Sequence, residues 1–199
     1  MKKVMIATKN PGKAKEFADL FQKYGIRVQS LLDMENSIDV EETGTTFAEN
    51  AILKAETISE RSGEAVIADD SGLVIDALDG WPGVYSARYA GLEKNDLANI
   101  EKVLKELKGV PLEKRTARFV CVLAVAIPGE ETLTFEGQCS GLITREKSGN
   151  NGFGYDPIFY LPEKGQTLAE LTKQEKNLIS HRAVALRKLT DKWLDLFIR

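Results

Sequence analysis

The sequence AVIADDSG, residues 65–72, places a short apolar run directly before two adjacent aspartates. Ala65 to Ala68 has the apolar character of a buried strand, and the polar residues that follow predict a turn at 69–72. The pattern of Leu73 to Ile75 then predicts a short return strand. Because α/β proteins bind ligands beyond the carboxyl ends of their strands, this junction is a candidate site.

The two aspartates at the junction suggest metal chemistry. Asp69 and Asp70 repel each other unless a cation or a proton lies near them. Mg²⁺ binds hard oxygen ligands, commonly one or two carboxylates together with phosphate oxygens. The alternative is a turn in which an aspartate accepts hydrogen bonds from backbone amides. We favour the functional interpretation of this pair.

Strand-like and helix-like segments alternate upstream of the junction. Pro11 opens a helical pattern that Gly25 ends, and Thr46 to Glu49 has the form of a capping box before a second helix ending at Gly63. Apolar runs predict strands at Val4 to Ala7 and at Arg27 to Leu31. The inward faces are predicted at Ala14, Phe17, Ala18 and Phe21 in the first helix, and at Phe47, Ala51, Ala55 and Ile58 in the second.

Longer elements are predicted downstream. A helix is expected from Asn95 to Lys108, with Leu97, Ile100, Leu104 and Leu107 inward. A strand at Thr116 to Ile127 and a turn at Pro128 to Glu131 lead into strand at 132–145, which suggests a hairpin. Thr172 to Glu175 is a second capping-box candidate. A last helix is expected from Ser180 to Phe197, with Ala183, Leu186, Trp193 and Phe197 inward. Crossover helices together with a hairpin predict an α/β fold with a mixed sheet.

Composition limits the class of protein. The 199 residues fit one domain or two small lobes, and 43% hydrophobic with 29% charged residues is an ordinary globular balance. Because 27 Lys and Arg face 30 Asp and Glu, the net charge of -3 argues against a globally basic nucleic-acid binder. The longest apolar run, Phe119 to Ile127, is well short of the roughly 20 residues that a membrane helix needs.

Targeting and redox signals are weak. The apolar start of the chain stops at Thr8, too early for a signal peptide. Cys121 and Cys139 form neither a disulfide framework nor a metal motif and are expected to be small buried residues. One histidine, His181, excludes a multi-histidine metal site. These features predict a reduced, cytoplasmic protein without membrane or nucleic-acid polymer partners.

Two polar loops precede helices. The first contains Thr8, Lys9, Asn10, Pro11, Gly12 and Lys13. It resembles a phosphate cradle at a helix N-terminus without being a P-loop, and the alternative is a plain turn with a solvated lysine. In the second loop, Glu41 and Glu42 are adjacent carboxylates, which taken alone suggest solvated surface.

The C-terminal third carries a glycine-rich aromatic loop and a basic cluster. Residues 149–157 combine three glycines with Phe153 and Tyr155, and aromatic faces stack on nucleobases. Asp156 can accept hydrogen bonds from a base or from a neighbouring arginine. The alternative is a turn whose aromatic side chains pack inward. Lys176, with residues 180–182, offers donors to a base or a phosphate, or is simply an exposed lysine near a helix start.

These motifs together resemble the inosine triphosphate pyrophosphatase family. The matching segments occur in family order over nearly the whole chain: residues 8–13, 41–44 with 47–55, 67–73, 82–89, 152–159, 175–176 and 180–182. The resemblance implies a single domain, residues 1–199, with an elongated mixed β-sheet flanked by helices and two lobes around a central cleft. It also implies Mg²⁺-dependent hydrolysis of ITP, dITP or XTP to the monophosphate and pyrophosphate, by a homodimer.

The resemblance also implies residue roles. Thr8, Asn10, Lys13 and Lys54 hold the triphosphate, with Lys9, Pro11 and Gly12 in the same loop. Glu41 and Asp70 lie at the metal, Asp70 accepts the proton, and Ser71 contacts the substrate. The base is held by Phe153, Gly154, Tyr155, Asp156, Lys176, His181 and Arg182. Whether Glu42 or Asp69 exchanges roles with its neighbour stays open.

A mechanism follows as a hypothesis. Water oriented or deprotonated by Asp70 attacks the α-phosphorus, and Lys13 and Lys54 stabilise the leaving pyrophosphate. Arg182 or Lys176 donates to a 6-oxo purine but cannot accept from the 6-amino group of adenine, which disfavours ATP. Two alternatives remain: a non-catalytic nucleotide sensor, and a pyrophosphatase for pyrimidine or modified nucleotides.

Overall fold

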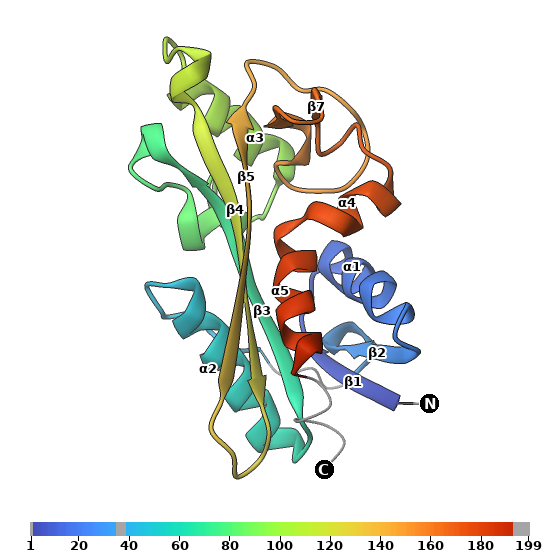
Figure 1. Ribbon diagram of the computed structural model, residues 1–199. Coiled ribbons are helices and arrows are strands. Elements are labelled where there is room, and N and C mark those ends of the chain that lie inside the picture. Colours follow the sequence, from blue (N-terminus) through green and yellow to red (C-terminus); the bar gives the residue numbers. More distant parts are fainter. Residues whose placement is uncertain (1, 35–38, 193–199) are drawn as a thin grey trace. The chain divides into compact units, whose positions relative to one another are not determined.

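The structure, a computed structural model, describes residues 2–34 and 39–192 (Figure 1). The helices in these ranges are α1 (Pro11–Gln22), α2 (Phe47–Ser62), α3 (Asp96–Glu106), α4 (Lys173–Ile179) and α5 (His181–Asp191). The strands are β1 (Lys2–Ala7), β2 (Ile26–Ser30), β3 (Val66–Ile75), β4 (Thr116–Ala126), β5 (Leu133–Ile143), β6 (Phe159–Leu161) and β7 (Gln166–Thr167). Within the same ranges, every helix is too short or too polar to span a bilayer.

The strands form the mixed sheet that the sequence predicts. Their order is β2-β1-β3-β4-β5-β6-β7. β1 pairs in parallel with β2 and β3, so that Ile6 lies between Ser30 and Ile67. β6 pairs antiparallel with β5 and β7. β4 and β5 are neighbours joined by residues 127–132, which confirms the expected hairpin connection.

One strand departs from the prediction at a decisive place. β3 runs without a break from Val66 to Ile75, so the predicted turn at 69–72 and the separate return strand are wrong. Charged residues usually interrupt a buried strand because burying an unpaired charge is costly. Here cationic side chains from distant parts of the chain neutralise the two aspartates, and the strand continues through them.

Most helix signals are confirmed, with local corrections. The capping box at Thr46 begins α2, and Gly63 ends it in the left-handed conformation with φ 69°. Thr172 caps α4 in the same way. Ser180 ends α4 instead of beginning the last helix, and α5 starts at His181. Trp193 and Phe197, expected on the inner face of that helix, lie outside the described residues.

Two predicted inward faces are rotated. On α1 the buried residues are Phe17, Leu20 and Phe21, whereas Ala18 is exposed. On α3 Leu97 is 58% exposed, and Val103 is buried instead. On α1 the larger Leu20 is buried in place of Ala18, because its burial removes more apolar surface from water. On α3 Val103 lies three residues after Ile100 and four before Leu107, on the stripe of the helix that faces the core.

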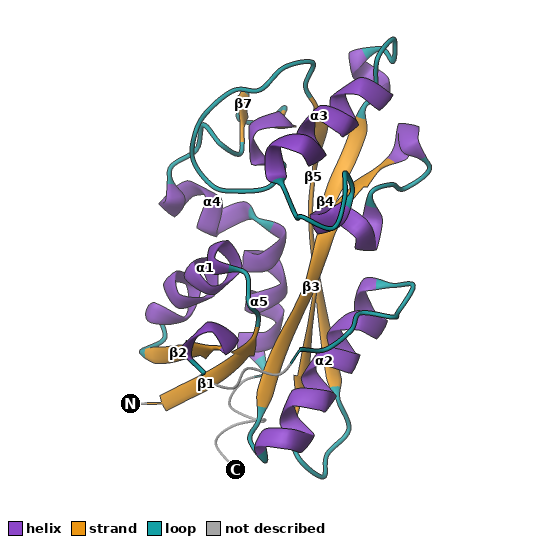
Figure 2. Cartoon of the chain, turned by 180° about the vertical axis from the view of Figure 1, so that it is seen from behind, coloured by secondary structure: helices purple, strands orange, loops and turns teal. Residues whose placement is uncertain are grey.

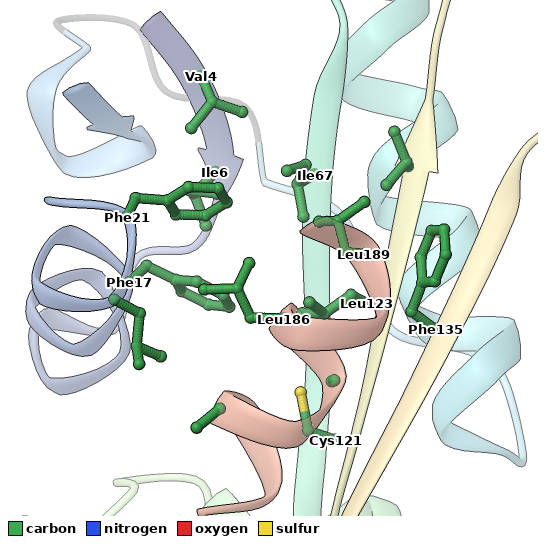
Figure 3. Packing of buried hydrophobic residues seen from close by; sticks show 14 of the residues in the cluster. Val4, Ile6, Phe17, Phe21, Ile67, Cys121, Leu123, Phe135, Leu186 and Leu189 are labelled. Atoms are coloured by element: carbon green, nitrogen blue, oxygen red, sulfur yellow. The ribbon is translucent and has the colours of Figure 1, made fainter. Parts of the chain in front are cut away.

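The chain divides into two compact units, each with its own core. Unit 1 comprises residues 1–70, 121–137 and 182–199, and unit 2 comprises residues 71–120 and 138–181. In unit 1, α1 and α5 lie on one face of the sheet and α2 on the other (Figures 1 and 2). Side chains from β1, β3, β4, α1 and α5 fill the core on the first face, including Ile6, Phe17, Ile67, Leu123 and Leu186 (Figure 3).

The core of unit 2 is built on residues of β3, β4 and β5 that belong to this unit, together with α3 and the loops around β6 and β7. Its members include Ile75, Ile100, Val103, Phe119 and Phe159. Cys121 belongs to the first core and Cys139 to the second, and both are free thiols, as expected for small buried residues.

The buried side chain of Arg115 connects three backbone segments of unit 2 by hydrogen bonds. Its guanidinium donates to the carbonyls of Leu107, Val110 and Thr144 at 2.7, 3.1 and 2.8 Å, and the residue is 4% exposed. Replacing it with alanine leaves three carbonyls without this donor, so we expect the free energy of unfolding to fall by about 3 kcal/mol. Urea unfolding measures this. The matched control is Arg118→Ala, whose exposed ion pair with Asp76 contributes about 1 kcal/mol or less.

Candidate functional site

Asp69 and Asp70 are successive residues of β3, so their side chains lie on opposite faces of the sheet. Successive side chains of a strand alternate between faces. Within β3, Asp69 therefore points toward α1 and α5, where it contacts Lys13 and Arg182. Asp70 points toward α2, where it contacts Asn50 and Lys54. Adjacent in sequence, the two carboxylates lie in different environments.

The carboxylate of Asp69 is fully buried, and both of its oxygens have ionic or hydrogen-bonding partners. Its Oδ2 accepts from Arg182 Nε at 3.3 Å and from Cys121 Sγ at 3.1 Å, and Lys13 Nζ pairs with Oδ1. Arg182 also pairs with Glu16. Burial alone would raise the pKa of Asp69, but the charges of Arg182 and Lys13 outweigh it and hold that pKa well below its ordinary value. Asp69 is therefore an ionised structural anchor.

Asp70 is held more loosely. Its Oδ1 lies 3.4 Å from Lys54 Nζ and its Oδ2 lies 3.3 Å from Asn50 Nδ2, and 7% of its side chain is exposed. Burial raises its pKa above the ordinary value, although the charges of Lys54 and Lys13 oppose the rise. A carboxylate with a raised pKa is a better proton acceptor than an ordinary one.

Lys54 joins Asp70 to the loop before α2. Its Nζ lies 2.7 Å from Glu42 Oε1 and 2.7 Å from the carbonyl of Asp69. Burial lowers its pKa, but the charges of Asp70 and Glu42 outweigh that effect and raise it. Glu42 and Asp70 therefore direct oxygens at one cation. Glu41, by contrast, is exposed, as the alternative of a solvated surface residue expects.

The predicted phosphate loop leads directly into α1 in unit 1. Thr8 is buried and its Oγ1 accepts from the amide of Asn10 at 3.2 Å. Asn10 caps α1 by accepting from the amide of Lys13 at 3.0 Å, and Pro11 and Gly12 open the helix. Lys13 is paired with Asp69, so the alternative of a plain turn with a solvated lysine is wrong for this residue. Lys9 lies at the surface and pairs with Asp39.

The glycine loop, residues 149–157 of unit 2, adopts the unusual backbone angles that its composition predicts. Gly149, Gly152 and Gly154 have φ values of 80°, 78° and 59°. Gly152 also lies so close to Asp156 that a Cβ atom would overlap its carboxylate. The amide of Gly154 donates to Asp96 Oδ2 at 2.8 Å.

The two aromatic residues of this loop behave differently. Tyr155 is buried and its hydroxyl donates to the carbonyl of Ser86 at 2.7 Å, so the alternative of an inward-packed aromatic is confirmed for Tyr155. Phe153 is only partly buried. The ammonium of Lys176 lies 5.0 Å from the centre of the Phe153 ring.

Asp156 and Lys176 form a buried ion pair in unit 2. Their atoms Oδ2 and Nζ are 2.6 Å apart, and the amide of Phe153 donates to the same oxygen at 3.0 Å. The cation seen beside Asp156 is thus the lysine Lys176. Lys176 is 7% exposed, so the alternative of an exposed lysine is wrong. This pair fixes the backbone of the glycine loop.

The remaining predicted residues fall into both units. His181 is buried in unit 2, where its ring stacks on Phe119 with centroids 4.8 Å apart, and Ser71 lies partly buried on β3. Arg182 follows His181 directly but belongs to unit 1, beside Asp69 and Glu16. The structure therefore groups Arg182 with the aspartates, whereas the sequence grouped it with Lys176.

Sequence reasoning missed Asn50, Glu16 and Asp96. Asn50 carried a signal: it lies four residues before Lys54, so both side chains share one stripe of α2. Asn50 is also next to Ala51 on the inward face, where a polar residue needs a partner. Glu16 and Asp96 have ordinary helical positions, and only the fold reveals their contacts with Arg182 and Gly154.

The Asp70 side of β3 fits a hard cation. Within the described ranges, no group of three or more His, Cys, Asp and Glu side chains could hold a metal ion alone. Asp70 and Glu42 nevertheless present oxygens around a single cationic group. Because Mg²⁺ commonly takes one or two carboxylates and completes its shell with water and substrate phosphates, this donor set suits it.

Comparisons with known proteins cover almost the whole chain. The model of the Ham1 family matches residues 4–192. A dITP/XTP pyrophosphatase of Geobacillus kaustophilus is 62% identical over 196 residues, covering 98% of this chain and 96% of the relative. The dITP/XTP pyrophosphatase of Bacillus subtilis is 60% identical over 190 residues, covering 96% of each protein.

Solved structures agree. The Ham1 protein of Staphylococcus aureus is 48% identical with a TM-score of 0.84, covering 96% of this chain and 97% of that one. A HAM1 protein of Coxiella burnetii is 42% identical with a TM-score of 0.87, covering 98% and 100%.

Proposed function

The chain belongs to the Ham1 family, and we propose that the residues around Asp70 bind the phosphates of its substrate and that the glycine loop recognises a purine base. The protein is a nucleoside triphosphate pyrophosphatase that hydrolyses ITP, dITP and XTP to the monophosphate and pyrophosphate, removing them from the nucleotide pool. The identity of about 60% to dITP/XTP pyrophosphatases over nearly the full chain carries this conclusion. The polar clusters on β3 and in the glycine loop suit a phosphate group and a base, respectively.

The phosphate end is assigned to unit 1. We propose that Thr8, Asn10 and the backbone of Pro11 and Gly12 contact the triphosphate at the start of α1, where helix geometry favours anions. Lys13 and Lys54 supply positive charge, and each is already held by a carboxylate on β3. Such anchored cations stabilise the charge that develops on pyrophosphate as it leaves.

The metal is proposed to be Mg²⁺ at Asp70, with Glu41 or Glu42 as the second carboxylate. Glu42 has the better supported position because its carboxylate already shares Lys54 with Asp70. When bound, Mg²⁺ neutralises phosphate charge. The exposed side chain of Glu41 is the alternative ligand.

Asp70 is proposed to orient and deprotonate the attacking water. Its side chain is buried but still 7% exposed, its two oxygens contact Asn50 and Lys54, and burial raises its pKa. Attack at the α-phosphorus then breaks the bond to the pyrophosphate group. The buried, fully paired carboxylate of Asp69 is unsuited to this role, and we assign it a structural one.

The base end is assigned to the glycine loop. We propose that Phe153 stacks on the purine while backbone groups of Gly154 and Tyr155, with Lys176 and His181, select its edge. Donors such as the Lys176 ammonium pair with a 6-oxo group and reject the 6-amino group of adenine. Ser71 and Arg182 remain predicted substrate contacts, as does Asp156, whose contact with Lys176 already gives it a positioning role.

Replacing Lys176 with methionine is expected to raise KM for ITP about 10- to 100-fold with a smaller effect on kcat, since it removes a donor that binds the substrate base. The preference for ITP over ATP should also fall. Steady-state kinetics on both nucleotides measure this. Lys173→Met, on the exposed side of the same helix, is the control. An unchanged ITP to ATP ratio would remove Lys176 from base selection.

The function is tested by measuring pyrophosphate release from ITP, dITP, XTP, GTP and ATP with and without Mg²⁺. We expect fast, Mg²⁺-dependent release from the first three and slow release from GTP and ATP. Comparable rates on ATP and ITP would refute the proposed base selection. Binding of these nucleotides without any release would instead indicate a sensor.

Three further expectations from the sequence remain proposals. These are a homodimer, a cytoplasmic location, and a single domain, residues 1–199, with two lobes and a cleft.

A further inference from the structure

Asn50 is the polar side chain of α2 that is completely buried, at 0% exposure. Burying an amide is costly unless its groups find partners. Its Oδ1 accepts from the amide of Gly44 at 2.8 Å, and its Nδ2 donates to Asp70 Oδ2 at 3.3 Å. One side chain thus connects the loop that carries Glu41 and Glu42 to the carboxylate proposed as the proton acceptor.

Asn50 and Lys54 together fix the plane of the Asp70 carboxylate. Four residues apart, they lie on one stripe of α2. Lys54 Nζ approaches Oδ1 of Asp70, while Asn50 Nδ2 donates to Oδ2. A carboxylate held at one oxygen can rotate, whereas one held at both has a defined orientation. The charged ammonium of Lys54 therefore holds one oxygen of Asp70, and the neutral amide of Asn50 holds the other.

The loop is fitted closely to Asn50. A Cβ atom on Gly44 would lie 2.7 Å from Asn50 Oδ1 and 2.7 Å from the Cβ of Glu49. Glycine is therefore required by the close approach of the loop to α2. A larger residue at position 44 would push the loop away from Asn50 or displace the amide.

We propose that Asn50 is a positioning residue. It orients the Asp70 carboxylate so that this group can accept a proton from the attacking water, and it holds the loop that carries Glu41 and Glu42 in place relative to Asp70. The inference rests on the proposed function. Asn50 does not touch the nucleotide in this account and acts only through Asp70 and Gly44. Its loss should therefore lower kcat much more than it weakens nucleotide binding.

A second buried asparagine supplies a matched control. Asn99 on α3 is 2% exposed, its Oδ1 accepts from the amide of Ala90 at 2.7 Å, and its Nδ2 donates to the carbonyl of Ala87 at 3.1 Å. It makes the same two kinds of bond as Asn50, but its second acceptor is a backbone carbonyl instead of a catalytic carboxylate. Asn50→Leu and Asn99→Leu thus remove comparable buried hydrogen bonds.

The experiment measures kcat and KM for ITP, the dissociation constant of a non-hydrolysable α,β-imido analogue of ITP, and the thermal midpoint of each variant. Both leucine variants should lower the midpoint. Asn50→Leu should also lower kcat about 100-fold, with KM and the analogue's dissociation constant within about threefold of wild type. Asn99→Leu should leave kcat within about twofold.

A second substitution covers the case in which Asn50→Leu does not fold. Gly44→Ala keeps every side chain of the site unchanged in identity, but the added Cβ atom overlaps Asn50 Oδ1 and should displace that amide. We expect kcat to fall about 10-fold or more. In Gly44→Ala/Asn50→Ser the smaller serine removes the overlap with Asn50 Oδ1, although the overlap with Glu49 Cβ remains. The effect on kcat should therefore be smaller than the sum expected from Gly44→Ala and Asn50→Ser measured singly. Full additivity would contradict a route through Asn50.

The outcomes separate the inference from the proposed function. If wild type does not hydrolyse ITP, the proposed function fails. If wild type is active and Asn50→Leu keeps the same kcat as Asn99→Leu, Asn50 is only structural and the inference is overturned. If the analogue's dissociation constant rises as much as kcat falls, Asn50 contributes to binding, which also contradicts a positioning role.

Discussion

Replacing Asp70 with asparagine is expected to lower kcat for ITP by about 1,000-fold, while the dissociation constant of a non-hydrolysable ITP analogue should change only about threefold. Asparagine keeps the shape and one oxygen of the side chain but cannot accept a proton from water. The effect should be larger than that of Lys54 or Lys176 variants, because those residues bind charge or base and do not move the proton. Steady-state and binding measurements on one preparation give both quantities.

The control for this substitution lies at the end of the same strand segment. Asp76 follows β3 directly, is 53% exposed at its side chain and pairs with Arg118. Asp76→Asn should leave kcat unchanged. If Asp70→Asn retains a kcat close to that of Asp76→Asn, another group accepts the proton and the assignment of Asp70 is wrong.

The second large effect is on stability and belongs to Asp69. Asp69→Asn leaves Arg182 and Lys13 without their shared buried anion, and an uncompensated buried charge costs about 3–5 kcal/mol. For a chain of this length the thermal midpoint should fall by roughly 10 °C or more. Calorimetry or circular dichroism measures the shift.

The adjacent substitution is the natural comparison for stability. Burial raises the pKa of Asp70, which means that its ionised form is disfavoured by folding at neutral pH. Asp70→Asn removes that cost and should be at least as stable as wild type. Equal losses of stability in Asp69→Asn and Asp70→Asn would contradict the division of roles between anchor and base.

Local signals predicted much of the fold correctly. The capping boxes at Thr46 and Thr172 and the left-handed Gly63 depend on neighbouring residues alone, and all are present. β3 could not be predicted in the same way. Its two aspartates look like a turn in isolation, and the cations that allow a strand there come from residues 13, 54 and 182, far away in sequence.

The candidate site shows the same limit. Local motifs and the family resemblance identified the candidate residues. Which aspartate is anchored and which is available depends on the alternation of side chains along β3, and this alternation holds only because the strand is continuous. The buried Lys176–Asp156 pair and the inward Tyr155 also depend on contacts across the fold. Asn50 lies four residues before Lys54, but this spacing points to a function only once the fold places Asp70 beside both side chains.

The most direct test of the central claim is one turnover of ITP in H₂¹⁸O with Mg²⁺, analysed by phosphorus NMR and mass spectrometry. Attack of water on the α-phosphorus predicts that the label enters inosine monophosphate and that pyrophosphate is unlabelled. Label in pyrophosphate, or release of orthophosphate as the first product, would contradict cleavage at the α-phosphorus by water held at Asp70.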